Sequence, residues 1–222
     1  MPIPIKTSFS LPLAAVLTAA MLPSIGAAAV DVPQTLKGIE NRYNSTKSLQ
    51  ANFAETYTFR GRKRTERGVL YLRKPGRMRW QYTSPAGKLF ISDGDFVYYY
   101  SPQENRAEKT KLKGTDDLRA PLAFLLGKLD FQRDFGEFIA KPEGADVVIT
   151  AIPKSGKLPY TQVSFVTGPD YTIKRLSVQG QDGSAYDYVF ENEKVNAPVA
   201  DALFRFTPPP GAQYVDSTRD GQ

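Results

Sequence analysis

The 222-residue chain contains neither Cys nor His. Without Cys it forms no disulfide bond, and it has no Cys on which a lipoprotein anchor could be built. The same two absences exclude Cys nucleophiles, Ser-His-Asp triads, and zinc sites made from Cys or His ligands. None of the three Gly-Lys pairs has the glycine spacing of a P-loop. We therefore expect no enzyme activity, no metal and no cofactor.

Long hydrophobic runs are also scarce. One apolar run, at 11–25, follows a single basic residue and precedes the small residues 26–29, which is the order of a secretory signal peptide. The run is short for a membrane span and two prolines interrupt it, which favours cleavage over anchoring. We expect residues 1–29 to be removed after Ala29. Residues 30–222 then form a single domain without a stable membrane segment.

A helix is expected at the start of this domain. Asp31 and Gln34 have the spacing of a capping box, with a proline between them in the first turn. The residues that follow place apolar side chains at helical spacing. These are Val32, Leu36, Ile39 and Tyr43. The pattern predicts an amphipathic helix over residues 32–46.

After residue 48 the apolar period changes from helical spacing to two, and turn signals recur at short intervals. Short strands with regular turns favour an antiparallel sheet or barrel over βαβ units. The sequence thus predicts a mainly β domain of about eleven strands. They are expected at 49–59, 67–73, 77–83, 88–93, 96–100, 106–112, 138–141, 146–152, 160–167, 172–179 and 184–191.

Residues 116–136 interrupt this strand pattern. Leucines recur there at helical spacing, with Pro121 near the expected start and Gly127 near the expected end. Asp130 is placed to cap another short turn. The segment predicts a strongly apolar helical insert, whose inward leucines include Leu122, Leu125 and Leu126.

Charge offers two weak signals. The net charge is +6, which suits either ordinary solubility or an acidic partner. A basic hairpin tip is either a solvated turn or a partner contact, and it consists of Arg60, Arg62, Lys63 and Arg64. Nucleic acid is disfavoured as a partner, because the basic footprint is small and the leader directs export.

Alternation in the stretch RKPGRMRWQY, at 73–82, predicts a strand with a polar and an apolar face. Met78, Trp80 and Tyr82 share the apolar face, while Arg77 and Arg79 point the other way. Neighbouring strands add Leu70, Leu72, Phe90, Phe96 and Tyr98. Two interpretations stay open: these side chains fill a barrel, or they line a cavity closed by the two helical segments.

At residues 73–102 the chain resembles the LolA family of periplasmic outer-membrane lipoprotein carriers. The resemblance consists of a basic residue before Pro75, Arg79-Trp80, Pro85, Ser92-Asp93-Gly94, and aromatics ending in Tyr100-Ser101-Pro102. The ending FRFTPPPG, at 204–211, is similar to the end of the family's chains.

The resemblance implies an unclosed antiparallel β-barrel, covering a hydrophobic cavity and closed by an N-terminal helix and a helical insert. It implies a periplasmic monomer that takes acylated lipoproteins from an inner-membrane ABC-type transporter and delivers them to an outer-membrane receptor. The implied acyl-binding residues are Leu70, Leu72, Met78, Trp80, Tyr82, Phe90, Phe96, Tyr98, Leu122, Leu125 and Leu126.

The resemblance also implies a latch. Family members carry an Arg before the proline of this block, which bonds to the lid helices and holds the empty state closed. Lys74 stands there, with Arg73 beside it and Tyr43 as a partner in the first helix. A lipid- or lipoprotein-sensing regulatory protein of the same fold, and a carrier of another lipid, are the alternatives.

Overall fold

The computed structural model describes residues 30–112, 129–156 and 158–218. The expected signal peptide and most of the expected helical insert, with Leu122, Leu125 and Leu126, lie outside the described residues. The helices and strands, in chain order, are α1 (Val32–Ser45), β1 (Ser48–Phe59), β2 (Arg62–Arg73), β3 (Arg77–Ser84), β4 (Ala86–Asp93), β5 (Phe96–Ser101), β6 (Arg106–Lys111), α2 (Phe131–Asp134), β7 (Phe135–Glu143), β8 (Asp146–Pro153), β9 (Tyr160–Thr167), β10 (Ile173–Gly180), β11 (Ala185–Val195), the 3-10 helix η2 (Asp201–Phe204) and β12 (Gln213–Asp216).

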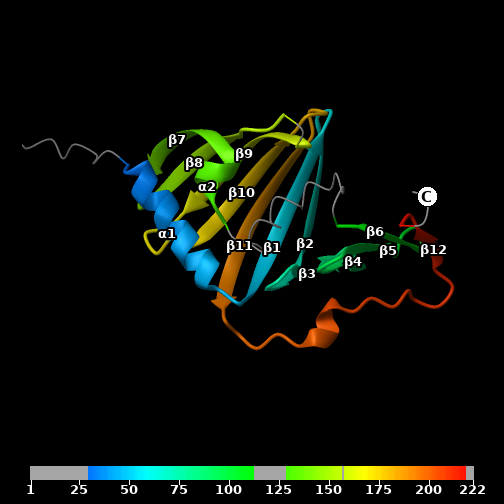
Figure 1. Cartoon of the computed structure of the whole chain (residues 1–222). Helices are drawn as coiled ribbons and strands as arrows, with labels where there is room; N and C mark the ends of the chain where they lie inside the picture. The colour runs from blue at the N-terminus through cyan, green and yellow to red at the C-terminus, as the bar shows by residue number, and fades with distance from the viewer. Residues whose placement is uncertain (1–29, 113–128, 157, 219–222) are drawn as a thin grey trace, which may run out of the picture.

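The twelve strands form one sheet in the order β12-β6-β5-β4-β3-β2-β1-β11-β10-β9-β8-β7. Neighbouring strands are antiparallel except β12, which runs parallel to β6. Strands β12 and β7 are the two free ends of this order, so the sheet is not closed. Figure 1 shows the sheet strongly twisted, with α1 crossing the face formed by its β8–β11 part. The mainly β, unclosed architecture predicted from the sequence is confirmed.

Helix α1 begins where its sequence predicts and ends one residue before the expected end at 46. The Asp31 carboxylate accepts a hydrogen bond from the backbone N–H of Gln34 at 2.9 Å, which satisfies one free donor of the first turn. Three side chains on one stripe are buried against the sheet, and they are Leu36, Ile39 and Tyr43. The helix stops at Thr46, whose backbone is extended.

The concave face of the sheet follows from the period of two along each strand. Antiparallel pairing places Ala51 opposite Leu70, Leu70 opposite Trp80, and Trp80 opposite Phe90. These four residues form a row across β1 to β4, and each has at most 2% of its surface exposed. The alternation in 73–82 therefore builds one wall of the interior.

The segment that follows β11 covers the convex face at β2 to β5. Figure 1 shows this segment passing from β11 through η2 to β12. Asp201 pairs with Arg73 at 2.7 Å and with Arg77 at 2.5 Å, and Arg79 donates to the carbonyl of Leu203 at 2.9 Å. Arg77 and Arg79 do point away from the concave face, as expected, and they contact this segment.

Two details differ from the sequence prediction. Strand β12 is a twelfth strand, where about eleven were expected, and its four residues follow the three prolines of the tail. The basic hairpin tip is shorter than expected, because β2 begins at Arg62 and leaves only Arg60 and Gly61 in the turn. Both turn residues have positive φ, at 49° and 76°, which a two-residue hairpin of this kind requires.

Candidate functional site

The apolar concave face is the candidate site. Six of the residues predicted to bind acyl chains lie together on it: Leu70, Leu72, Met78, Trp80, Tyr82 and Phe90. Between 0% and 4% of each is exposed, so they form a continuous buried wall. Side chains of α1 pack in the same core, namely Leu36, Ile39 and Tyr43.

Phe96 and Tyr98 do not join this wall. Tyr98 pairs with Ile91, one position out of phase with Phe90, and therefore lies on the convex face. There the ring of Tyr98 stacks on Phe206, with 5.4 Å between ring centroids, and Lys109 Nζ lies 3.9 Å from the centroid of Phe96. Burial, followed by the hydrogen bond to Asp93, raises the pKa of Tyr98 to about 12. The concave residues of β5 are instead Val97 and Tyr99.

Sequence reasoning missed an aromatic part of the wall. Phe53 on β1 meets Trp80 edge to face at 4.6 Å between ring centroids. Tyr188 and Phe190 on β11 lie 5.4 and 6.5 Å from Trp80 and stack on each other. The signal was present, because Tyr186, Tyr188 and Phe190 recur at spacing two. Long separation in sequence concealed that β11 pairs with β1.

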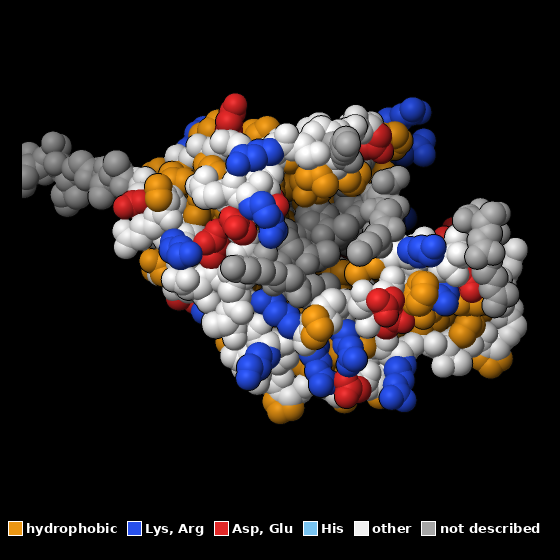
Figure 2. Space-filling view, viewed as in Figure 1, with side chains coloured by type: hydrophobic (Ala, Val, Ile, Leu, Met, Phe, Trp, Pro, Cys, Tyr) orange, Lys and Arg blue, Asp and Glu red, His pale blue; other side chains and the backbone are white. Residues whose placement is uncertain are grey.

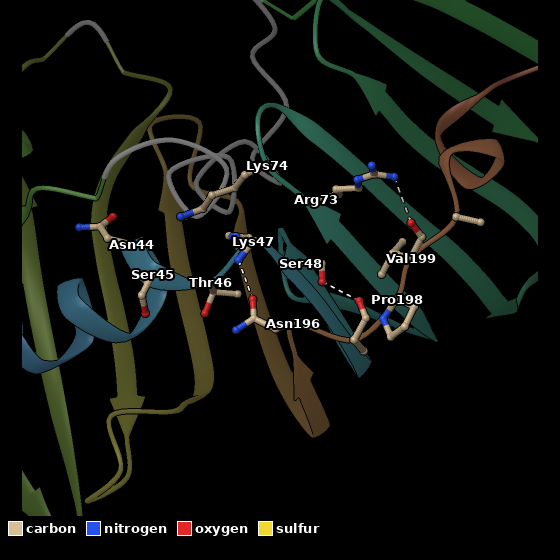
Figure 3. Close-up of a pocket in the computed structure, with 12 residues that line it drawn as sticks. Asn44, Ser45, Thr46, Lys47, Ser48, Arg73, Lys74, Asn196, Pro198 and Val199 are labelled. Carbon is tan, nitrogen blue, oxygen red and sulfur yellow. Dashed lines mark hydrogen bonds between the residues drawn. The ribbon is translucent and has the colours of Figure 1, made fainter.

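Lys74 connects the β2–β3 turn to α1. Its Nζ donates a hydrogen bond to the backbone carbonyl of Tyr43 at 2.6 Å. Partial burial lowers the pKa of Lys74. Figure 3 shows the Arg73 side chain pointing the other way, where it donates to the carbonyl of Val199. Of the two basic residues considered for a latch, Lys74 is the one in contact with the helix.

Tyr43 ties the same helix to strands β10 and β11. Its hydroxyl donates to Glu193 Oε2 at 2.9 Å and accepts from the backbone N–H of Ile173 at 2.9 Å. Arg42 pairs with the same carboxylate at 2.6 Å. Burial, followed by the Glu193 charge, raises the pKa of Tyr43 well above its ordinary value. The phenol therefore stays neutral at a pH where a free tyrosine would ionise, and its two hydrogen bonds fix its position.

A third tie joins α1 to the chain before α2. The Asn44 side chain exchanges two hydrogen bonds with the backbone of Leu129, at 2.9 and 2.7 Å. Glu40 accepts from the backbone N–H of Phe131 at 3.0 Å. Phe131 opens α2, which Asp130 caps as expected, and its ring stacks on Phe165. The helix thus covers the concave face through polar contacts at its edges and apolar contacts beneath.

Two kinds of space surround this helix. An open cleft of about 1040 Å³ lies between its end, the start of β1, the end of β2 and residues 196–200 (Figure 3). Beneath it, two voids of about 10 Å³ each lie against Tyr43 and Leu49. Neither void is large enough for an acyl chain, so this part of the interior is closed. Figure 2 shows apolar side chains gathered on this side of the molecule.

A charged cluster borders the apolar wall. Lys88 Nζ donates to Glu66, and both residues are buried to 95% or more. Tyr82 donates to Glu55 at 2.8 Å, and Lys88 lies 4.3 Å from the centroid of the Tyr82 ring. The cluster is internally paired, as buried charges must be. Within the described part of the chain, no group of three acidic side chains is arranged to hold a metal ion.

The predicted partner contact lies at the hairpin tip, far along β1 from α1. Arg60, Arg62 and Lys63 are exposed there. Arg64 is also exposed and pairs with Glu66 at 3.2 Å. The tip therefore presents several charges to solvent. Its role as a partner contact stays a prediction.

The chain resembles known carriers in sequence. The family model for "Outer membrane lipoprotein carrier protein LolA" matches residues 44–207. An outer-membrane lipoprotein carrier protein of Pectobacterium carotovorum is 31% identical over 182 residues, covering 81% of this chain and 87% of that protein. One from Klebsiella pneumoniae is 28% identical over 183 residues, covering 82% and 87%.

Two solved structures overlap most of this chain, with TM-scores below 0.5. A LolA superfamily protein from Nitrosomonas europaea matches 80% of this chain and 99% of its own with a TM-score of 0.44 at 10% identity. The protein titled MucB matches 82% of this chain and 65% of its own, with a TM-score of 0.47 at 15% identity. Among the described residues, no helix has the length and apolar character to cross a membrane. The family match spans more than half of the sequence, and the chain belongs to the outer membrane lipoprotein carrier protein LolA family.

Proposed function

We propose that this protein carries acylated lipoproteins through the periplasm by burying their acyl chains against the concave face of its sheet. It receives them from an inner-membrane ABC-type transporter and passes them to an outer-membrane receptor. It acts as a monomer, catalyses no reaction, and needs neither nucleic acid nor stable membrane insertion. The family membership supports the cargo class, while the route and the two partners are part of the proposal.

The observation that carries the proposal is one apolar core, which joins the wall on β1 to β4 to the side chains of a separately anchored helix, α1, over the β8–β11 part of the sheet. The wall is continuous and buried, and α1 contributes only one stripe of side chains to it. Lys74, Tyr43 and Asn44 hold the helix at three points. Release of these contacts would expose the part of the concave face beneath α1 without breaking a single strand pairing.

The energetics require such a lid. Burial of acyl chain is worth about 0.8 kcal/mol per CH₂, so one long chain contributes on the order of 10 kcal/mol before any cost. A permanently open pocket of that affinity would not release its cargo. In the proposed cycle, closure of α1 buries Leu36, Ile39 and Tyr43 in place of the acyl chains, and this self-contact offsets the gain from binding.

The test is mass spectrometry of the native protein isolated from its periplasm. We expect co-purifying peptides with an acylated N-terminal Cys, in amounts that rise when the outer-membrane receptor is depleted. Recovery of a glycolipid without any lipoprotein would instead favour carriage of another lipid. Protein that stays free of lipid under receptor depletion would contradict the proposal.

A further inference from the structure

Trp80 has an unusual buried donor. It is the chain's single Trp, its surface is 0% exposed, and its indole Nε1 has no hydrogen-bond partner among the described residues. An indole N–H only donates, and buried ones usually find an acceptor. A buried polar group left without a partner is uncommon enough to require an explanation.

The surroundings of Trp80 are largely aromatic and aliphatic. The rings of Phe53, Tyr188 and Phe190 pack on it, and Leu70 and Phe90 flank it on the neighbouring strands. A Phe would fit the same apolar wall without burying a donor. The N–H therefore makes no hydrogen bond to the described residues in the closed state, and an acceptor brought in by a ligand would satisfy it.

We infer that Trp80 Nε1 donates a hydrogen bond to an acyl carbonyl oxygen of the bound lipid. The inference rests on the proposed function, because it assigns a recognition contact within that site. Ester and amide carbonyls accept hydrogen bonds, whereas the hydrocarbon of an acyl chain does not. The contact selects chains attached through a carbonyl and sets the depth at which the lipid head lies in the wall.

The contact also suits a carrier energetically. In the empty state the donor is already removed from water and unpaired, so its desolvation cost destabilises the closed, empty form. Loading with a carbonyl-bearing lipid removes that penalty, and closure without cargo restores it. One atom thus shifts the balance toward the loaded state without adding apolar area.

The experiment compares two lipopeptides with the same peptide and chain length. One carries two palmitoyl esters on the glyceryl-Cys group, and the other carries two hexadecyl ethers and so lacks both carbonyls. We expect the wild-type protein to bind the ester probe on the order of ten-fold more tightly. Because Trp80 is the chain's single Trp, its fluorescence should shift to the red with the ester probe only.

Two variants isolate the N–H. Trp80→Phe is expected to reduce the ratio of ester to ether affinity to about one. If Phe unfolds the protein, benzothienylalanine at position 80 removes the N–H and keeps the bicyclic shape. Phe190→Leu removes a neighbouring ring and should weaken the binding of both probes equally. Equal wild-type affinity for ester and ether would overturn the inference and leave lipid carriage standing. Failure to bind either probe would overturn both.

Discussion

At the scale of single residues, Lys74 decides how firmly α1 is held at the β2–β3 turn. Its Nζ makes one 2.6 Å hydrogen bond to the Tyr43 carbonyl. An ammonium on a flexible stem directs this bond less than a guanidinium would. We expect Lys74→Met to lower the free energy of unfolding by about 1 kcal/mol and to increase uptake of an apolar fluorescent dye. Urea unfolding and dye titration measure the two effects.

Arg73 supplies the matched control. It is the neighbouring cation, but it contacts Val199 and Asp201 on the convex face. Arg73→Met should therefore leave dye uptake at the wild-type level. If both variants take up dye equally, Lys74 is not a specific latch.

Tyr43 gives a prediction in pH. Its pKa is raised in the folded protein by burial and by Glu193, whereas the unfolded phenol titrates near 10. Above about pH 10 the unfolded state loses a proton that the folded state keeps, so stability falls with rising pH. For this one group the slope is about 1.4 kcal/mol per pH unit.

Tyr43→Phe lacks this titration. At pH 7 the variant should be less stable by about 1–3 kcal/mol, because Glu193 loses its donor and Ile173 N–H loses its acceptor. Between pH 10 and 11 the difference in free energy of unfolding between the variant and the wild type should narrow, as measured by urea unfolding at each pH. A gap that stays constant over this interval would mean that the phenol ionises as readily in the folded state.

At the scale of elements, prediction succeeded where alternation was present and failed where it was not. In 77–82 polar and apolar residues alternate, and Met78, Trp80 and Tyr82 lie inside as predicted from sequence. In β5 the stretch Phe-Val-Tyr-Tyr-Tyr offers apolar side chains to both faces, so the sequence pattern does not show which of them face the interior. The register with β4 decides which side chains face inward. Phe206, more than one hundred residues away, covers Tyr98 on the outer side.

Gly68 on β2 makes room for the aromatic wall. A Cβ at this position would lie 2.2 Å from the carbonyl oxygen of Gln81 and 2.7 Å from the Phe53 ring. We expect Gly68→Ala to destabilise the protein by at least 2 kcal/mol, since backbone on β3 must move. Near-ultraviolet circular dichroism should change, because Phe53 packs edge to face on Trp80 and Tyr82.

Gly136 on β7 is the control for this substitution. Its Cβ would meet only the Lys154 side chain, at 3.4 Å, and its surface is exposed. Gly136→Ala should change stability by no more than about 0.5 kcal/mol. Equal effects of the two substitutions would show that the close approach at Gly68 is relieved without cost.

At the scale of the whole molecule, the sheet and α1 differ in how they are held. Strands β1 and β2 are central, with a partner on both sides, and the segment around η2 supports the convex face through buried Phe204. Helix α1 is attached by one apolar stripe and a few polar contacts. It should therefore open as a local unit while the sheet stays folded.

Native-state hydrogen exchange tests this difference between α1 and the sheet. Amides of α1 should exchange at a lower free energy than those of β1 and β2, which require global unfolding. Lys74→Met should speed exchange in α1 and leave β1 unchanged. Phe204→Ala should do the reverse, lowering global stability by about 3–5 kcal/mol and accelerating the central strands. Protection of α1 equal to that of β1 would mean that helix and sheet open together, and a lid that moves alone would have to be abandoned.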